Sequence, residues 1–430
     1  MLRSTLHRMS SRTWKTARIR KFSHFKSLSS LFNPTEEHRA LRDMLRTFVA
    51  NEVEPQAHEY NRTETFNLPL FRKLGTVNPD GLGLLGLTVP EEYNGTNFID
   101  ATAVAIVHEE IAYSDPAFCL SYLAHSLLFI NNLAVNGSHE QKLQFLPDAC
   151  DGSKIGGMCM SEPNAGTDVL GMKTNAIYDE SQSSWILNGS KMWITNGTLT
   201  GADTGDIFLV YARTGEGRSD ITQFIVEKDM EGFTLGQKIE DKLGMRASNT
   251  AELVFENVLI PSETHVVGNV NEATLCMMRN LEIERLGLAA MGIGIARRCV
   301  DEMKQYAGDR KAFNARDLFD FGQIQRHIAE SYADCMAGRC YVYGVANGLD
   351  LMTHGNGLDA DGTKLYCAQM SKLVADRAIQ VMGGFGYVGE YTVERLWRDA
   401  KLLEIGGGTN ESHHKNMARD LRKMGGNRLD

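Results

Sequence analysis

The sequence predicts an α+β fold in which a helical domain, an antiparallel β domain and a helical bundle follow one another along the chain. Apolar residues recur at helical spacing from Asn33 to about Lys154, in alternation from Gly156 to about residue 265, and at helical spacing again from Glu272. A chain of 430 residues is also long for one hydrophobic core. We therefore expect domains at residues 33–155, 156–267 and 268–430, preceded by a distinct segment at residues 1–32.

The first segment is strongly basic. Residues 1–30 contain eight Lys or Arg and no Asp or Glu, and Leu2, Leu6 and Met9 lie at helical spacing. A basic, Ser-rich N terminus of this kind is typical of a mitochondrial transit peptide, and a basic tail without regular structure is the alternative. We expect residues 1–32 to be a transit peptide and the mature protein to lie in the mitochondrial matrix.

The rest of the chain is acidic. Without the first 30 residues the formal charge falls from −9 to −17, which argues against a nucleic-acid partner. No apolar run reaches the length needed to span a bilayer, so we expect no membrane span. The eight Cys form no C-x-x-C pair, and we interpret them as core residues or free thiols with no metal site.

Helix start signals and apolar spacing define the first domain. Pro34-Thr35-Glu36-Glu37 is a start signal, and helical spacing continues through Ala101–Ala112 and Phe118–Val135. The run Gly81–Gly86 reads G-x-G-x-x-G, but Val89-Pro90 stops any helix after it. We interpret this run as a turn and not as a dinucleotide-binding loop.

Short β-rich runs define the middle domain. Ser184–Leu187 and Ser190–Thr195 flank Asn188-Gly189, a pair typical of two-residue hairpin turns. Further strands are expected at residues 206–213, 221–227 and 250–258. In the last domain, apolar stripes predict four helices that pack as a bundle, at residues 272–307, 317–350, 361–382 and about 409–423.

One carboxylate interrupts an apolar stripe of the first bundle helix. Leu281, Glu284, Leu288, Met291 and Ile295 are three, four, three and four residues apart, so they share one helix face. Glu284 should therefore point into the interior, where an unpaired carboxylate is strongly unfavourable. This stretch alone leaves two interpretations open, an ion pair with a nearby Arg or a base that a reaction needs.

Four separated motifs stand in order along the chain. They are CMSEPNAGTD at Cys159–Asp168, WITN at Trp193–Asn196, QVMGGFGY at Gln380–Tyr387 and RDAK at Arg398–Lys401. Together they resemble the acyl-CoA dehydrogenase family over about residues 34–423. The resemblance implies that family's fold, with an N-terminal helical domain, a central antiparallel β domain and a C-terminal four-helix bundle. It also implies FAD as cofactor, an acyl-CoA substrate, electron-transfer flavoprotein as electron acceptor, and a homotetramer.

The resemblance implies that two parts of the chain hold flavin. Trp193 would flank the ring system while Ser161 and Thr195 bond its polar edge, because a flavin is a flat apolar ring with polar edges. Taken alone, Trp193 could instead be an ordinary core aromatic. Arg310 and the turn at 380–384 would reach the FAD of a neighbouring subunit, so a monomer could not work. The implied cofactor set is Met158, Cys159, Met160, Ser161, Thr167, Trp193, Ile194, Thr195, Arg310, Phe321, Gln323, Gln380, Gly383, Gly384, Thr409, Asn410 and Glu411.

The resemblance also bears on Glu284. Many family members carry the catalytic base in a run like Tyr-Glu-Gly-Thr, where this chain reads Ile405-Gly406-Gly407-Gly408-Thr409 and has Gly407 at the base position. The isovaleryl branch of the family moves the base to the position of Glu284. The resemblance therefore implies that Glu284 removes the α proton of an acyl-CoA while the β hydrogen leaves as hydride, giving a trans-2-enoyl-CoA.

The three glycines point to the substrate. They leave room for a methyl branch, although a loop with positive φ would also need glycine. We expect a short branched acyl-CoA, first of all isovaleryl-CoA, which would give 3-methylcrotonyl-CoA in leucine breakdown. The amide of Gly407 or Gly408 would lie near the thioester oxygen. By resemblance, the acyl-CoA would contact Thr167, Tyr211, Ala212, Glu282, Arg285, Leu288, Gly406, Gly407 and Gly408.

Three departures from the family pattern leave alternatives open. Phe321-Gly322-Gln323 displaces a Gln expected at FAD, Leu275 replaces a Tyr that faces the substrate, and Ser412-His413-His414 replaces an apolar residue and two Arg. The adjacent His residues should point in different directions and bind no metal. The alternatives are another short acyl chain (2-methylbutyryl, isobutyryl or butyryl), a non-catalytic structural subunit and, with less support, an acyl-CoA oxidase.

Overall fold

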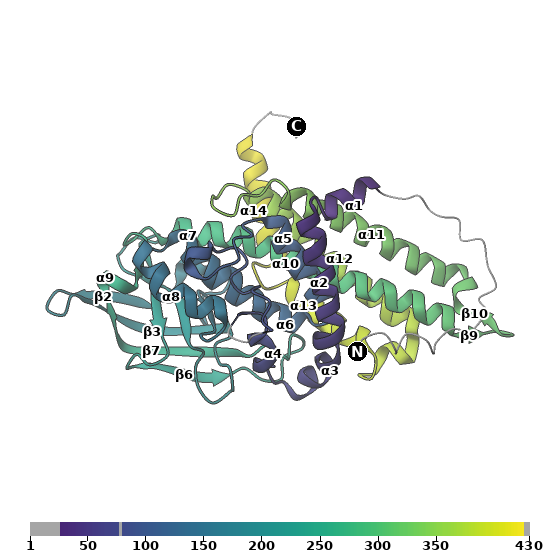
Figure 1. Cartoon of the computed structure of the whole chain (residues 1–430), viewed down its shortest axis with the longest axis horizontal. Coiled ribbons are helices and arrows are strands. Elements are labelled where there is room, and N and C mark those ends of the chain that lie inside the picture. The colour runs from purple at the N-terminus through teal and green to yellow at the C-terminus, as the bar shows by residue number, and fades with distance from the viewer. Residues whose placement is uncertain (1–25, 77–79, 425–430) are drawn as a thin grey trace, which may run out of the picture.

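The computed structural model describes residues 26–76 and 80–424, so most of the predicted transit peptide lies outside the described residues. Along the chain, a sheet region lies between two helical regions, as the sequence predicts. Figure 1 shows the strands at one end of the molecule and the long C-terminal helices extending to the other. The predicted fold class is confirmed.

The N-terminal region is a layer of helices built around one fully buried element, α5 (Ala101–Ala112). The Asp100 side chain starts this helix by accepting a hydrogen bond from the Ala103 amide at 2.9 Å. Its neighbour α2 begins after the predicted Thr35 cap. The other elements are α1 (Lys26–Phe32), α2 (Glu36–Phe48), η1 (Val49–Val53), α3 (Glu54–Thr63), α4 (Leu68–Arg72), η2 (Glu91–Tyr93), α6 (Pro116–Tyr122), η3 (Leu123–Asn131), α7 (Asn132–Asn136) and α8 (His139–Asp151).

The continuous helix formed by α6, η3 and α7, Pro116–Asn136, is long and apolar enough to cross a membrane by length and composition. This corrects the expectation that no apolar run reaches that length. The most apolar window of this helix is 89% buried inside the protein, where it packs on strand β1 (Gly156–Cys159) and on helix α10 (Ala273–Asp309). Its apolar side chains therefore form part of the core. The Gly81–Gly86 run forms no helix or strand, and a turn begins at Leu85, in agreement with its interpretation as a turn.

The central sheet has eight strands in the order β6-β7-β3-β2-β4-β5-β8, with β1 beside β4. Most pairs are antiparallel, as expected, but β1 and β2 each pair with β4 in parallel, so the sheet is mixed. The strands besides β1 are β2 (Asn175–Asp179), β3 (Ser184–Thr195), β4 (Ile207–Arg213), β5 (Ile221–Glu227), β6 (Phe233–Lys238), β7 (Thr250–Pro261) and β8 (Val266–Val267).

The predicted hairpin at Asn188-Gly189 is wrong. Strand β3 continues through both residues between β2 and β7, with a register shift at this point. Gly189 has a φ of +142° and no room for a Cβ beside Thr174, so it forms a β-bulge. The Asn188 side chain accepts a hydrogen bond from the Asn257 amide at 2.9 Å and thereby ties β3 to β7. The chain turns instead between Asp179 and Ser184.

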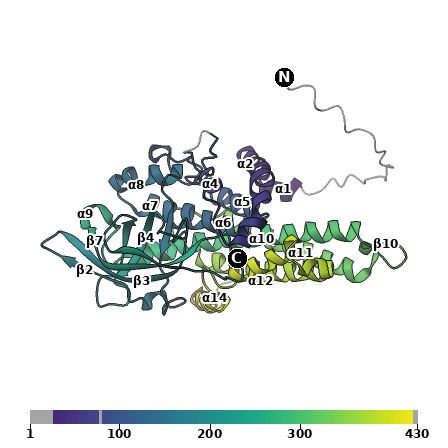
Figure 2. The same cartoon turned by 90° about the horizontal axis from the view of Figure 1, so that it is seen from below.

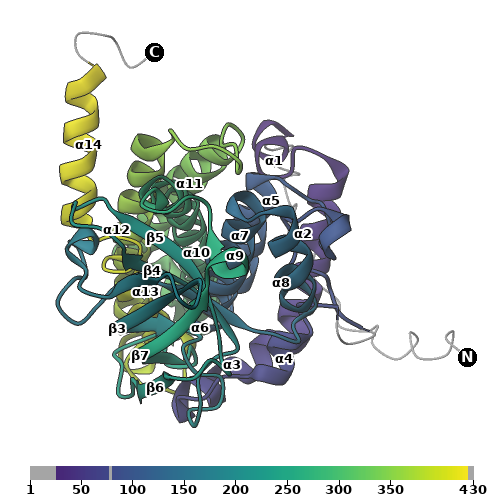
Figure 3. The ribbon, with the colours of Figure 1, turned by 90° about the vertical axis from the view of Figure 1, so that its left-hand side faces the viewer.

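Four helices form the C-terminal bundle, which Figure 2 shows extending away from the sheet. Three of them, α10, α11 and α12, match predicted helices, whereas α13 was not predicted. The last predicted helix is α14, which packs on α12 and projects from the body in Figure 3. The elements after α10 are β9 (Lys311–Ala312), β10 (Arg316–Asp317), η5 (Leu318–Asp320), α11 (Gly322–Ala346), α12 (Gly357–Met382), η6 (Gly383–Tyr387), α13 (Thr392–Leu403) and α14 (Asn410–Met424).

A buried ion cluster joins the N-terminal layer to the bundle. Glu109 of α5 binds Arg42 of α2 at 3.1 Å and Arg339 of α11 at 2.9 Å, and it also binds Arg297 of α10. Burial alone would raise the pKa of Glu109, but these three guanidinium groups hold it well below its ordinary range. Because each partner comes from a different helix, the cluster fixes the relative positions of α2, α5, α10 and α11.

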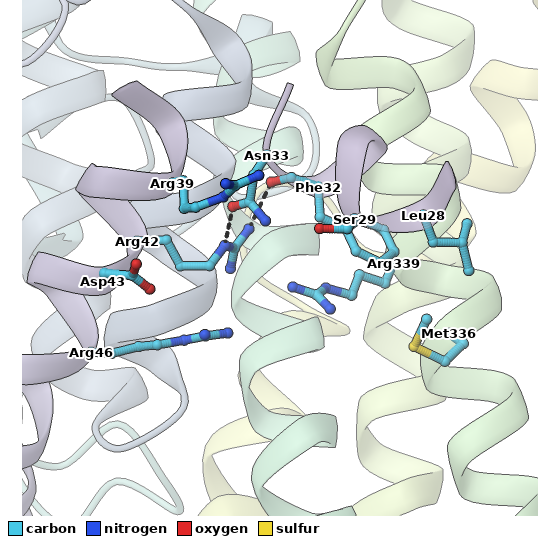
Figure 4. Close-up of a pocket in the computed structure, with 10 residues that line it drawn as sticks. All are labelled: Leu28, Ser29, Phe32, Asn33, Arg39, Arg42, Asp43, Arg46, Met336 and Arg339. Atoms are coloured by element: carbon cyan, nitrogen blue, oxygen red, sulfur yellow. Dashed lines mark hydrogen bonds between the residues drawn. The ribbon is translucent and has the colours of Figure 1, made fainter. Parts of the chain in front are cut away.

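A surface pocket of about 380 Å³ opens beside this cluster, between α1, α2 and α11 (Figure 4). Arg42 hydrogen-bonds Asn33 at 2.7 Å and the carbonyl of Phe32 at 3.1 Å in its wall. Phe32, the last residue of the predicted transit peptide, is therefore packed against the body of the protein. The pocket contains none of the predicted site residues. It is lined by Leu28, Ser29, Phe32, Asn33, Arg39, Arg42, Asp43, Arg46, Met336 and Arg339.

Candidate active site

Glu284 lies in the first half of α10, where the residue as a whole is half-buried and its carboxylate is turned inward, as the apolar stripe predicts. Its Oε2 atom is buried and has no hydrogen-bond partner among the residues that the structure describes. Within the described residues Glu284 forms no ion pair with an Arg, which was the alternative interpretation, because the neighbouring Arg285 binds Asp361 at 2.9 Å instead. Burial raises the pKa of Glu284 to about 7, against the opposing charges of Arg285 and Lys364. The site thus contains a carboxylate with raised basicity and no structural partner.

The glycine loop between α13 and α14 lies directly against Glu284. Gly407 and Gly408 have φ angles of +67° and +102°, a region that favours glycine. A Cβ on Gly407 would overlap Leu288 Cδ1 and would lie 3.5 Å from Glu284 Cδ. The two interpretations of these glycines are therefore compatible, because the loop needs positive φ and also leaves space beside the carboxylate. Within the described residues, the Gly407 and Gly408 amides have no acceptor.

We expect Gly407→Ala to lower the free energy of unfolding by about 1–3 kcal/mol, because the new Cβ adds backbone strain at positive φ and overlaps Leu288. The same overlap should displace the loop and reduce turnover. Gly406→Ala is the matched control for stability, since its Cβ would make ordinary contact with Leu402 O at 3.6 Å. Chemical denaturation and steady-state rates of both variants test this. Equal behaviour of the two variants would contradict the assigned role of Gly407.

An exposed aromatic wall lies on strand β3. Trp193 is 59% exposed and adopts a φ of +66° where the pairing of β3 with β7 shifts register. The interpretation of Trp193 as a core aromatic is therefore wrong, and Trp185 takes the core position. The carbonyl of Ser161 accepts a hydrogen bond from the adjacent Met192 amide at 2.9 Å, so the loop after β1 lies beside this wall. A flat ring with polar edges fits this combination of an exposed aromatic face and adjoining backbone.

A buried ion pair supports the loop that follows β1. Lys191 of β3 is fully buried and binds Glu162 at 2.9 Å and the carbonyl of Met160 at 3.1 Å. Glu162 in turn accepts the backbone amides of Lys173 and Thr174. Burial of Glu162 would raise its pKa, but Lys191 and these donors hold it lower. The pair therefore fixes the backbone that carries Met160 and Ser161.

Several predicted substrate contacts have other surroundings. Tyr211 and Ala212 are fully buried in β4, and the Tyr211 hydroxyl accepts a hydrogen bond from Asn132 at 3.2 Å. Glu282 is buried and accepts hydrogen bonds from the backbone amides of Gly355 and Asn356. In contrast, a Cβ on Gly407 would lie next to both Leu288 and Glu284, and Arg285 donates a hydrogen bond to the Gly407 carbonyl at 3.3 Å. Thr167 lies exposed on the loop after β1.

A second group of predicted cofactor residues lies at the far end of the bundle from the sheet. Arg310 directly precedes β9, which Figure 1 shows at that end. The Arg310 guanidinium lies over the Phe385 ring, 5.8 Å from its centroid, beside the exposed Gly383 and Gly384. A Cβ on either glycine would meet nothing within 4 Å. This group, completed by Phe321, Gln323 and Gln380, is therefore separated within one chain from Trp193 and Ser161.

The chain matches family models over three consecutive stretches. These are the N-terminal, middle and C-terminal domains of acyl-CoA dehydrogenase, at residues 35–153, 157–258 and 274–422. The fold and these matches show that the chain belongs to the acyl-CoA dehydrogenase family, oxidoreductases that act on CH–CH bonds.

Individual relatives carry finer descriptions. The mitochondrial isovaleryl-CoA dehydrogenase of Solanum tuberosum is 40% identical over 422 residues, which cover 96% of this chain and 98% of that protein. The mitochondrial 2-methylacyl-CoA dehydrogenase of the same plant is 37% identical over 424 residues, with the same coverage of both chains. A solved acyl-CoA dehydrogenase complexed with FAD from Bacillus anthracis has a TM-score of 0.82 and 29% identity, and the match covers 91% of this chain and 68% of that one.

Helical spacing also marks Lys364, a further charged residue near the site that the motifs do not include. Ala360, Lys364, Cys367, Ser371 and Val374 are four, three, four and three residues apart on α12, and all are buried. This is the same pattern that singled out Glu284, a charge inside a buried stripe. His413, which the motifs marked only as a departure, is also buried and binds Asp361 at 2.8 Å, whereas His414 is exposed.

Proposed function

We propose that the protein is an FAD-dependent dehydrogenase of a short branched acyl-CoA, with isovaleryl-CoA as its preferred substrate and 3-methylcrotonyl-CoA as its product. The observation that carries this proposal is the buried, unpaired carboxylate of Glu284 against the side-chain-free loop at Gly407. The reaction needs a base beside an apolar acyl chain, and burial gives a carboxylate that strength. The 40% identity to a mitochondrial isovaleryl-CoA dehydrogenase supports this substrate.

In this proposal each group of the site has one task. Glu284 takes the proton from the carbon next to the thioester, and the amides of Gly407 and Gly408 donate to the thioester oxygen as negative charge develops there. Leu288 and the glycine loop form the wall of the acyl pocket. When bound, FAD supplies the acceptor for the hydride from the β carbon. Electron-transfer flavoprotein is the proposed next electron acceptor.

The residues around Trp193 fit FAD. The exposed indole offers a flat apolar face, and the side chains of Ser161 and Thr195 are partly exposed nearby in sequence and strand. The buried Lys191–Glu162 pair holds the backbone of this region in place. Asn410, also expected at FAD, has a buried Oδ1 atom without a hydrogen-bond partner among the described residues. Buried polar atoms normally have such a partner, and a bound cofactor would supply it.

Two further parts of the proposal concern assembly and location. We propose a homotetramer in which Arg310, Gly383 and Gly384 complete the FAD site of a neighbouring subunit, because β9, which follows Arg310, lies far from β3, which carries Trp193, in Figure 1. We propose the mitochondrial matrix as the location, supported by the basic segment at residues 1–30 and by relatives named as mitochondrial.

The direct test is anaerobic reduction of the purified flavoprotein by a panel of acyl-CoA thioesters. We expect isovaleryl-CoA to bleach the flavin absorbance faster than 2-methylbutyryl-CoA, isobutyryl-CoA or butyryl-CoA. Faster bleaching by 2-methylbutyryl-CoA would show that the reaction is assigned correctly but the preferred substrate is not. This thioester is the second candidate substrate, because the chain is 37% identical to a 2-methylacyl-CoA dehydrogenase. Absent flavin, or no bleaching by any thioester, would overturn the proposed function in favour of a non-catalytic subunit.

A further inference from the structure

Charged side chains from three helices meet behind the glycine loop, and none of them was assigned a role from the motifs except Arg285. Lys364 of α12 donates a hydrogen bond from Nζ to the carbonyl of Gly408 at 2.5 Å. Arg285 of α10 donates to the carbonyl of Gly407 at 3.3 Å and binds Asp361 of α12 at 2.9 Å. The two carbonyls of the loop are therefore each held by a cation.

The cluster is buried, although charges are costly to bury. Lys364 is fully buried, and Asp361 is only 2% exposed. His413 of α14 binds Asp361 at 2.8 Å and packs its ring against Gly408, 3.1 Å from where a Cβ would lie. Burial lowers the pKa of His413 below its ordinary value, although the bond to Asp361 opposes that shift.

We propose that Lys364 is a positioning residue for the reaction, which clamps the Gly407-Gly408 backbone and supplies positive charge that favours the ionised form of Glu284. This inference rests on the proposed function, because it assigns Glu284 as the base. Lys364 acts through Glu284 and the loop and does not itself contact the reacting carbon atoms. Two further residues hold the loop in place. Asp361 binds Arg285, and the His413 ring packs on Gly408.

The charge effect has a definite sign. Burial lowers the pKa of Lys364 to about 8, and Glu284 opposes that shift, so Lys364 is mostly charged at pH 7. A cation close to a carboxylate favours the ionised form of the carboxylate. The groups that face Glu284 or Lys364 from the surrounding elements are Arg285 of α10, Asp361 of α12, Glu404 after α13 and His413 of α14. Lys364 and Arg285 are the two cations that act on Glu284.

The test measures the ionisation of Glu284 in the holoenzyme without relying on turnover. Infrared difference titration follows the carboxylic acid band, and Glu284→Gln identifies that band by its loss. We expect Lys364→Met to raise the pKa of Glu284 by about 1 unit or more, since an opposite charge has been removed. The rising limb of the pH profile of flavin reduction should move upward by the same amount. Lys372→Met on the same helix is the control, and neither quantity should change in it.

Two more variants separate the clamp from the charge. Lys364→Arg keeps a cation and a donor and should restore the wild-type pH profile at least in part. Lys364→Gln keeps a donor for the Gly408 carbonyl and should show the shift in pKa even if Lys364→Met does not fold. An unchanged Glu284 pKa in both uncharged variants, or an equal loss of activity at every pH, would overturn the inference and leave Lys364 a packing residue. If no acyl-CoA reduces the wild-type flavin, the proposed function fails, while the infrared titration still decides the effect of Lys364.

Discussion

Replacing Glu284 by Gln should leave flavin bound and lower the rate of flavin reduction by about 10³-fold, which is within the range for removal of a general base. The substitution keeps the size of the side chain and removes only its ability to take a proton. The buried Oε2 atom has no partner to lose, so the fold should tolerate the change. Stopped-flow reduction with isovaleryl-CoA measures the rate, and the flavin absorbance at equilibrium measures occupancy.

The pH dependence of the wild type gives an independent check on the same residue. Because burial raises the pKa of Glu284 in the free enzyme to about 7, the kcat/KM for oxidation of the acyl-CoA should rise as the pH rises through 7. The raised pKa also means that the folded state favours the protonated carboxyl. Its stabilising contribution is complete below the unfolded-state pKa and is lost as the pH rises through 7. Glu284→Gln should therefore be more stable than the wild type above that pH, by about 1–3 kcal/mol.

The matched control for this substitution is Glu302→Gln on the same helix. Glu302 binds Arg298 at 2.8 Å, one helical turn away, and takes no part in the glycine loop. Its replacement should leave the rate and the pH profile of flavin reduction unchanged. A Glu284→Gln protein that still reduces its flavin at the wild-type rate would refute the assignment of the base.

Helical periodicity predicted most of the fold because it depends on local spacing. The α10 stripe placed Glu284 inward before any contact was known, since residues at this spacing share one face whatever packs on it. The same rule would have found α13, in which Val393, Leu396, Ala400 and Leu403 are buried at intervals of three and four residues. The RDAK motif lies in this stretch, whose periodicity also indicates a helix.

The errors in the sheet have a non-local cause. Asn188-Gly189 has the local chemistry of a hairpin turn, but β7 lies along β3 and pairs with residues on both sides of this point. The positive φ that a hairpin turn would require is used here for a bulge. Which strands lie parallel to β4 also depends on partners far apart in the chain, and no single run of residues encodes that choice.

The site followed the same division between local and long-range information. Glu284 and the glycines could be found from spacing and motifs, whereas the contacts of Lys364 and His413 with Gly408 join residues from three separate elements. The motifs also could not show that the proposed flavin residues fall into two groups. That separation depends on the packing of the domains, which places β3 and β9 far apart in Figure 1.

The two separated groups lead to a prediction about mixed oligomers. Arg310→Ala alone should lose bound flavin, because the proposed site in the neighbouring subunit loses its cation. Glu284→Gln alone keeps the flavin but lacks the base. In a mixed oligomer, an Arg310→Ala subunit still has Glu284 and can receive Arg310 from its Glu284→Gln neighbour. Random pairing of equal amounts should therefore restore about one quarter of the wild-type turnover.

The surface around Arg310 supports this expectation. Phe313 is 78% exposed and Tyr387 is 82% exposed in the single chain, and the Arg310 guanidinium lies over the Phe385 ring. Large aromatic side chains gathered at one end of a molecule are typical of a surface that another protein covers. Co-expression of equal amounts of differently tagged variants gives the random mixture in which one quarter is expected, and two-step purification isolates the oligomers that contain both variants, whose turnover should be higher. Arg326→Ala on the exposed face of α11 is the control, and it should retain flavin by itself. Mixed oligomers without activity would show that Arg310 and Glu284 serve no shared site across the interface.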